Sequence, residues 1–149
     1  MRFVLSALFG LAALPGFAGD VHDCDFAARA QNIAEPWEEN TRTFANGAVR
    51  VAVLDTTEPA AAAFHLLVLS PPYTELGTRQ CRVVSFEGGH GYASLTLDGL
   101  VADYHPSTGL TLEMAISVYN QDTALFDPGS LFVTINQATG QITAEEIGS

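Results

Sequence analysis

The sequence contains no lysine and only six arginines, against 17 acidic residues in 149. All 17 acidic residues and five of the arginines follow residue 18, so residues 19–149 carry a formal charge of −12. Nucleic-acid binding needs clustered cations that displace counterions, and this scarcity excludes nucleic acid as a partner. Two explanations of the acidity remain: solubility with repulsion between copies, or recognition of a basic partner.

Long hydrophobic runs are equally scarce, and the longest lies at the beginning of the chain. Arg2 precedes an apolar run from Phe3 to Leu14, which Pro15-Gly16 breaks before the small residue Ala18. This layout is typical of a cleavable secretory signal. A retained membrane anchor is disfavoured, because a transmembrane helix needs about 20 apolar residues.

The residues around the end of this run favour one cleavage site. Cleavage after Ala18 leaves small Gly16 and Ala18 at the two positions that the peptidase recognises, whereas cleavage after Gly19 places bulky Phe17 at one of them. We therefore predict a signal peptide over residues 1–18 and a single globular domain over residues 19–149. The protein is expected to be periplasmic or secreted, with no membrane association after the signal is removed.

Cysteine is limited to Cys24 and Cys81. In the oxidising compartment that export implies, an intramolecular disulfide between them is the expected state. No Cys-x-x-Cys spacing is present, so a structural role is favoured over a redox role.

The residues after the signal predict one short helix. Asp23 or Asp25 serves as its cap, and Pro36 ends it. Apolar residues between them recur at i, i+4 and i+7, at Phe26, Ala30 and Ile33. The cysteine at position 24 would then fasten this helix to the strand that contains Cys81.

From Asn46-Gly47 onward the hydrophobic period changes to two and the residues become β-branched and aromatic. Residues 49–55, 64–69, 80–86 and 110–119 are the clearest strands. Residues 100–104 precede the last of these strands across a hairpin at Thr108-Gly109, and residues 131–135 and 141–144 form a second hairpin at Thr139-Gly140. The predicted fold class is α+β, with an N-terminal helix followed by an antiparallel β-meander of about seven strands. A small β-sandwich is the alternative.

One glycine-rich loop, residues 87–91, is the best candidate for a binding or active site. It combines Glu87, His90 and a mobile backbone, and Tyr92 follows directly. We take Glu87, His90 and Tyr92 as binding candidates, although an ordinary loop has the same composition. No catalytic signature is present, so no catalytic residue is assigned. His65, in an apolar run, is expected to be a hydrogen-bonded core histidine.

Acidic residues and a histidine also crowd residues 20–25. Cleavage after Gly19 would create the terminus Asp20-Val21-His22, whose nitrogens can bind copper(II) or nickel(II). Because the favoured cleavage follows Ala18, no metal site and no cofactor are expected, and the cluster is interpreted as a solvated, helix-capping end.

Three segments, Phe64–Pro72, Arg79–Ser85 and Tyr104–Leu112, resemble a group of small exported proteins of Gram-negative bacteria that have no assigned activity. The resemblance implies a periplasmic location and an intact pair of cysteines, and it implies no catalytic or binding residue. The favoured function is a disulfide-linked β-rich binding or structural module whose partner is a protein or a small ligand. The alternative is a small hydrolase or metal-dependent enzyme that uses Glu87 and His90.

The intact mass of the exported protein tests the processing and the disulfide together. We expect a chain that begins at Gly19 and gains about two hydrogen masses on reduction. A chain that begins at Asp20, or a mass unchanged by reductant, would contradict these two expectations respectively.

Overall fold

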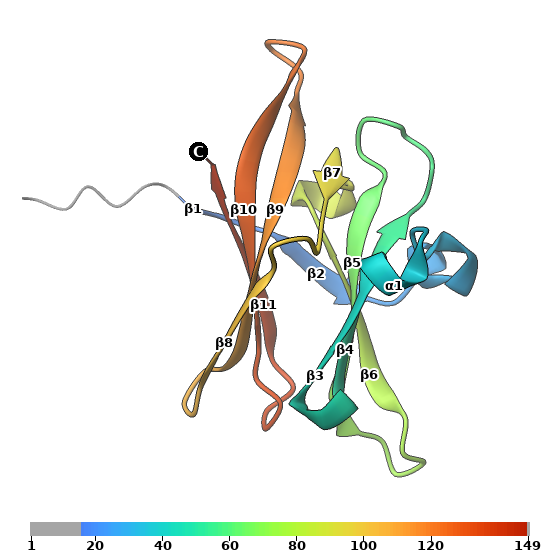
Figure 1. Cartoon of the computed structure of the whole chain (residues 1–149), viewed down its shortest axis with the longest axis vertical. Coiled ribbons are helices and arrows are strands. Elements are labelled where there is room, and N and C mark those ends of the chain that lie inside the picture. The colour runs from blue at the N-terminus through green and yellow to red at the C-terminus, as the bar shows by residue number, and fades with distance from the viewer. Residues whose placement is uncertain (1–15, 149) are drawn as a thin grey trace, which may run out of the picture.

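Two antiparallel β-sheets face each other across one apolar interior (Figure 1). The structure is a computed structural model, and it describes residues 16–148. Residues 1–15 of the predicted signal peptide lie outside the described residues. Two sheets in contact correct the predicted α+β meander and match the sandwich that was its alternative.

The sheets are called A and B here. Sheet A has the order β1 (Gly16–Ala18), β11 (Ile142–Gly148), β10 (Leu125–Ile135), β9 (Gly109–Asn120) and β7 (Ser94–Leu95), and β8 (Val101–His105) also pairs with β9. Sheet B has the order β2 (Asp20–Asp23), β6 (Arg79–Ser85), β5 (Phe64–Tyr73), β4 (Val49–Asp55) and β3 (Thr41–Phe44). The helical segments are one-turn elements: α1 (Trp37–Asn40) and the 3₁₀ turns η1 (Phe26–Ala28), η2 (Ala30–Asn32), η3 (Ala45–Gly47) and η4 (Glu87–Gly89).

The predicted N-terminal helix is wrong. Asp25 does cap a turn, since its carboxylate accepts from the Ala27 amide at 2.9 Å. Arg29 is extended, however, and it separates η1 from η2. The side-chain amide of Asn32 donates to the carbonyls of Phe26 and Ala27, and so takes acceptors that a helix would use internally.

Burial explains why this segment does not become a helix. Phe26, which the prediction placed on the buried apolar face, is 65% exposed. Its neighbour Ala27 is buried instead. Most helical stability in proteins comes from a buried apolar face, which this segment does not have. The residues before it form β2, which pairs with β6.

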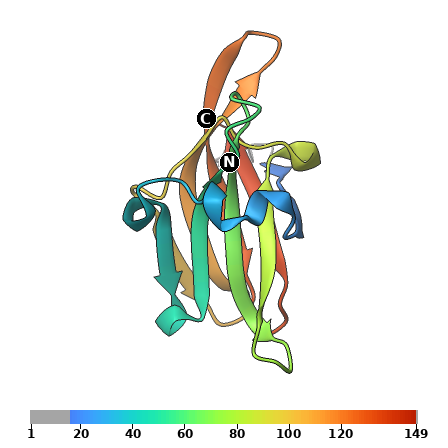
Figure 2. The same ribbon diagram turned by 90° about the vertical axis from the view of Figure 1, so that its right-hand side faces the viewer.

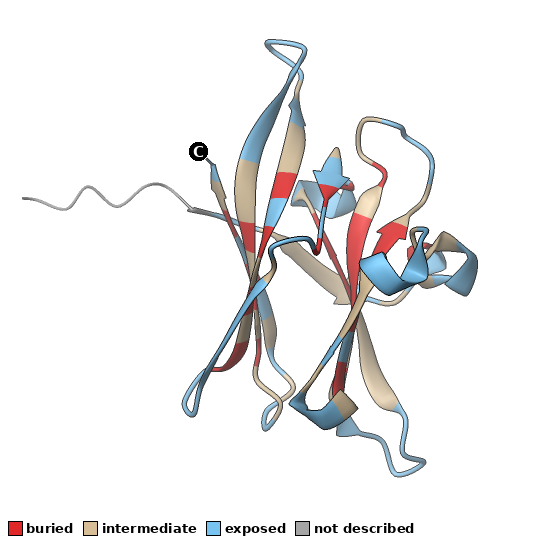
Figure 3. Cartoon of the chain, in the orientation of Figure 1, coloured by how far each residue is buried: buried red, intermediate tan, exposed pale blue. Residues whose placement is uncertain are grey.

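The main core lies between the sheets, as the red segments of Figure 3 show. From sheet A, alternate residues of β9 enter it, including Leu112 and Met114. From sheet B, it receives Val51 and Leu66, among others. The period of two that predicts these strands therefore corresponds to one buried face on each sheet.

A second, smaller cluster covers the outer face of sheet B. Ala27 of η1 packs there with Ala52, Leu54, Leu67 and Val83. This contact explains why β4 and β5 are apolar on both faces, as a strand covered on both sides requires. Figure 2 shows the N-terminal turns lying across this sheet.

Several local predictions are confirmed. Both Thr-Gly hairpins lie in sheet A, joining β8 to β9 and β10 to β11. Gly109 and Gly140 have φ of 100° and 80°, the left-handed region that favours glycine. The end of β5 differs from expectation: the strand continues through Pro71-Pro72 to Tyr73, with a shift in register against β6.

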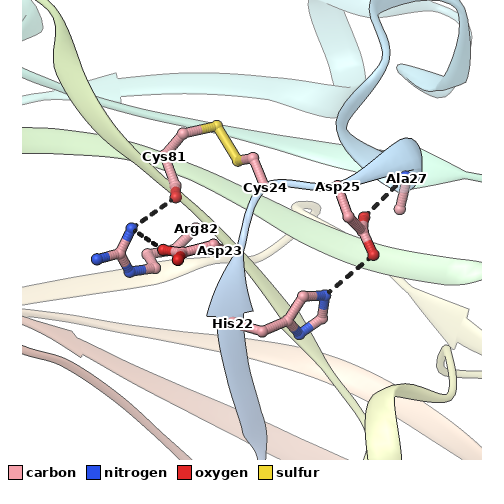
Figure 4. Close-up of a disulfide and its surroundings, with 7 residues drawn as sticks. All are labelled: His22, Asp23, Cys24, Asp25, Ala27, Cys81 and Arg82. Carbon is pink, nitrogen blue, oxygen red and sulfur yellow. Dashed lines mark hydrogen bonds and ion pairs between the residues drawn. A yellow bond between two sulfur atoms is a disulfide. The ribbon is translucent and has the colours of Figure 1, made fainter.

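The predicted disulfide is present, with the Cα atoms of Cys24 and Cys81 5.4 Å apart (Figure 4). Asp23, next to it, forms an exposed ion pair with Arg82 at 2.6 Å. The cross-link does not fasten a helix. It joins the end of β2 to β6, a strand that β2 also meets through backbone hydrogen bonds.

Among residues 16–148, the structure has no helix long and apolar enough to cross a membrane.

Replacing both cysteines by serine tests the contribution of the disulfide. Because the cross-link spans 57 positions, the chain-entropy model gives a loss of about 4 kcal/mol in the free energy of unfolding, measured by urea titration. Asp23→Asn is the control. It removes an exposed ion pair beside the disulfide and should cost less than about 1 kcal/mol. Equal midpoints for the double-serine variant and the wild type would contradict the expected role.

Candidate functional site

The chain crosses from sheet A to sheet B at Gly19. The residues before it, β1, pair with β11, and the residues after it, β2, pair with β6. The Gly19 amide donates to the Ala144 carbonyl at 3.1 Å, which holds the crossing point against β11. A buried polar contact between Tyr92 and Glu146 lies beside this point.

Tyr92 joins the two sheets through its hydroxyl group. Its side chain is fully buried, and its Oη lies 2.7 Å from Oε1 of Glu146 on β11 and 3.2 Å from the carbonyl oxygen of Ser85 on β6. Its backbone forms a bridge with Phe64 of β5. One residue of the connection between the sheets thereby contacts both of them.

Glu146 is only 6% exposed, and burial raises the pKa of its carboxyl group. The hydrogen bond from Tyr92 opposes this rise in pKa, and the negative charge of Glu87 adds to it. Burial also raises the pKa of the Tyr92 phenol, followed in size by the effect of Glu146. When Glu146 is ionised, the phenol donates to it. When Glu146 is protonated, the acid can donate to the phenol, which is then free to donate to Ser85.

Gly19 lies against this pair and has no room for a side chain. A Cβ at this position would be 2.9 Å from Cβ of Ala144, 3.1 Å from Oε1 of Glu146 and 3.4 Å from Oη of Tyr92. The first of these distances is too short for carbon atoms in contact. Glycine is therefore required where the chain passes the buried carboxyl group.

A groove of about 520 Å³ opens beside the same carboxyl group. Its apolar lining comes from sheet A, including β1, and from Phe86 in the connection that follows β6. The apolar lining residues are Phe17, Ala18, Phe86, Ile116, Val118, Pro128 and Ile147. Glu87, Asp127 and Glu146 are its acidic residues. Phe17 lies opposite Glu146 in the register of β1 and β11, so both project from the same face of sheet A. Phe17 is 66% exposed.

The three binding candidates of the glycine-rich loop do not share one surface. Glu87 and His90 are exposed, and the contact between them is from the ring Nδ1 of His90 to the backbone oxygen of Glu87, at 2.9 Å. Tyr92 lies inside the protein and bonds to Glu146. Glu87 reaches the groove, whereas His90 lines a separate cavity of about 130 Å³.

The expectation for His65 is confirmed. It is 7% exposed, and its Nδ1 lies 2.8 Å from Oγ of Ser85. Burial lowers its pKa, and the neighbouring His22 lowers it further. A histidine beside a serine hydroxyl resembles part of a hydrolytic triad, but Ser85 is fully buried, so this hydroxyl does not face a substrate.

The acidic N-terminal cluster is loosely arranged around His22. Its Nε2 is 3.7 Å from a carboxylate oxygen of Asp25, and its Nδ1 is 4.0 Å from one of Asp20 (Figure 4 shows the contact with Asp25). Within residues 16–148, no three His, Cys, Asp or Glu side chains are grouped so as to hold a metal ion.

Glu146 is not among the site residues predicted from the sequence. A signal for it does exist: Ile142, Ala144 and Glu146 alternate along β11, so the pattern that places Ala144 in the core also places Glu146 there. The strand predicted after Thr139-Gly140 ends at residue 144, whereas β11 continues to Gly148. Comparison of the chain with protein-family models, curated proteins and solved structures finds no match.

Tyr92→Phe tests the link between the sheets. The change removes one oxygen and leaves the Glu146 carboxyl group without its phenol partner in a buried position, so we expect a loss of roughly 1–3 kcal/mol in the free energy of unfolding. Tyr104→Phe, at an exposed tyrosine, is the matched control and should fall within about 0.5 kcal/mol of the wild type. Equal losses in both variants would mean that the Tyr92 hydroxyl has no special role.

Proposed function

We propose that this chain is an exported, disulfide-linked β-sandwich that binds an extended segment of a basic protein partner along β11. The observation that carries the proposal is the position of β1. Residues 16–18 belong to the predicted signal peptide, and they form the strand that covers the edge of β11. Removal of residues 1–18 leaves that edge uncovered.

An uncovered edge presents unpaired backbone groups that another extended chain can satisfy. β1 pairs antiparallel with Glu145, Glu146 and Ile147. After its removal, the amides and carbonyls along this stretch are available for strand addition, a common mode of peptide recognition. The partner segment would occupy the position of β1 and, like β1, would run antiparallel to β11.

The groove beside the edge supplies the side-chain contacts. Phe17 lines this groove in the structure, with apolar residues such as Phe86 and Ile147. Alternate side chains of an added strand point to the same face, so an aromatic or large aliphatic residue at the Phe17 position would enter the groove. Backbone pairing would give affinity, and this position would give selectivity.

The negative charge of the chain favours a basic protein partner over a second copy of this chain. Glu87 and Asp127 line the groove, and residues 19–149 have a formal charge of −12 without any lysine. Two such chains repel each other, whereas a basic segment is attracted. The disulfide fits an oxidising compartment outside the cytoplasm, and the resemblance to small exported proteins supports the same location.

A labelled peptide tests the proposal on the exported protein. The probe has the sequence of residues 14–18, Leu-Pro-Gly-Phe-Ala, with two arginines added at its N-terminus, and binding is followed by fluorescence anisotropy. We expect saturable binding, and roughly two- to fivefold weaker binding when serine replaces the phenylalanine. Phe17 is 66% exposed in its position, so about one third of the roughly 1.5–3 kcal/mol for full burial of the ring applies. Amide hydrogen exchange should slow at residues 145–147 when the peptide is present.

A pair of charge variants provides the control. Glu87→Gln, in the groove, should weaken binding and reduce its dependence on salt. Glu75→Gln changes another exposed glutamate, on the hairpin between β5 and β6 at the far end of the sandwich (Figure 1), and should leave binding unchanged. Absence of binding, or protection elsewhere than β11, would refute the proposal.

A further inference from the structure

Glu146 is a buried carboxyl group in a protein with few cations. Within residues 16–148, the structure gives its carboxyl group the Tyr92 hydroxyl as partner and places no arginine or histidine in an ion pair with it. The charged groups that act on this pair, Asp20 and Glu87, are both acidic. Buried charges in proteins are ordinarily paired, so the site lacks a counter-ion.

We propose that cleavage between Ala18 and Gly19 supplies this counter-ion, because the new α-ammonium group of Gly19 pairs with the Glu146 carboxylate. The inference uses the export on which the proposed function also depends, and it is independent of peptide binding. Hydrolysis by the signal-processing peptidase breaks the Ala18–Gly19 amide bond. The hydroxyl of water goes to the carbonyl carbon of Ala18, and the Gly19 nitrogen takes up protons to become an ammonium group, while the new acid on Ala18 ionises.

The position of Gly19 supports the pairing. A Cβ on Gly19 would be 3.1 Å from Oε1 of Glu146, so standard backbone geometry places the Gly19 nitrogen within roughly 6 Å of that oxygen. As an amide, this nitrogen has one hydrogen, and it donates to Ala144. As an ammonium group it has three hydrogens and a positive charge, so it can keep the bond to Ala144 while its charge attracts the Glu146 carboxylate over this distance.

Glycine is the residue that this arrangement needs at the new terminus. A side chain there would meet Ala144, Glu146 and Tyr92 at close distance. Cleavage one residue later would move the amine to Asp20, which pairs with Ser85 on sheet B, and would remove the residue that approaches the carboxyl group. The pairing therefore favours the same bond that the small residues before it favour.

The absence of lysine makes the ion pair directly measurable. In a chain that begins at Gly19, the α-amino group is the only amine, so a trace of acetic anhydride acetylates it and no other nitrogen of comparable reactivity. The rate is followed by mass spectrometry of the N-terminal peptide between pH 6 and 10. We expect acetylation of the folded exported protein at pH 8 to be at least about tenfold slower than in urea, with the pKa of the amine above its ordinary value of about 7.7–8.0.

Two matched variants assign the effect to Glu146. In Glu146→Gln, the acetylation rate and the pKa of the amine should return to near their values in urea. In Glu145→Gln, at the exposed neighbouring position, both should remain as in the wild type. An unchanged pH profile in Glu146→Gln, or equal changes in the two variants, would overturn the ion pair.

A second measurement covers the case in which Glu146→Gln does not fold. Acetylated and unmodified wild-type protein differ by one charge, and acetylation should lower the urea midpoint at pH 7 if the pair exists. Equal midpoints would refute the pair. Failure of the peptide to bind would leave these outcomes unchanged, whereas a mature terminus other than Gly19 would refute the ion pair itself.

Discussion

The contact between the hydroxyl of Tyr92 and the carboxyl group of Glu146 constrains the part of the fold in which the two sheets are joined. A carboxyl group that is 6% exposed must be protonated, hydrogen-bonded or paired with a cation. The phenol satisfies one oxygen and, through Ser85, ties the carboxyl-bearing strand to the opposite sheet. The close approach of Gly19 then follows, because only a residue without a side chain passes between Ala144 and this pair.

Local patterns in the sequence predicted the strands well and their assembly poorly. The alternation along β9 and the two Thr-Gly turns are properties of neighbouring residues, and both are confirmed. The helix was wrong because spacing at i, i+4 and i+7 does not show whether Phe26 has anything to pack against. The division into two sheets was only the alternative for a similar reason: in a sandwich each sheet alone looks like a meander, and the contact between them is long-range.

The candidate site was likewise predictable where it depends on neighbouring residues and not where it depends on contacts between distant ones. The glycine-rich loop, which local composition predicts, lies beside the site: Glu87 lines the groove, and Tyr92 enters the core next to it. Glu146, the hydrogen-bond partner of Tyr92, lies 54 positions away in the sequence, and no local pattern connects the two residues. Disulfide pairing was predictable because two cysteines allow only one intramolecular connection, whereas 17 acidic residues allow many.

Processing at Gly19 would reverse the effect of pH on stability at this site. While residues 16–18 remain attached, burial raises the pKa of Glu146 in the folded state, so stability is greatest below the usual glutamate pKa and falls as pH rises through the raised value. An ammonium group beside the carboxylate favours its ionised form instead. The stabilisation from this site would then be present above the usual glutamate pKa and would be lost as pH falls. At alkaline pH it would be lost again, when the amine deprotonates. One bond would thus determine both whether the edge of β11 is free and whether the Glu146 carboxyl group is stable as an anion.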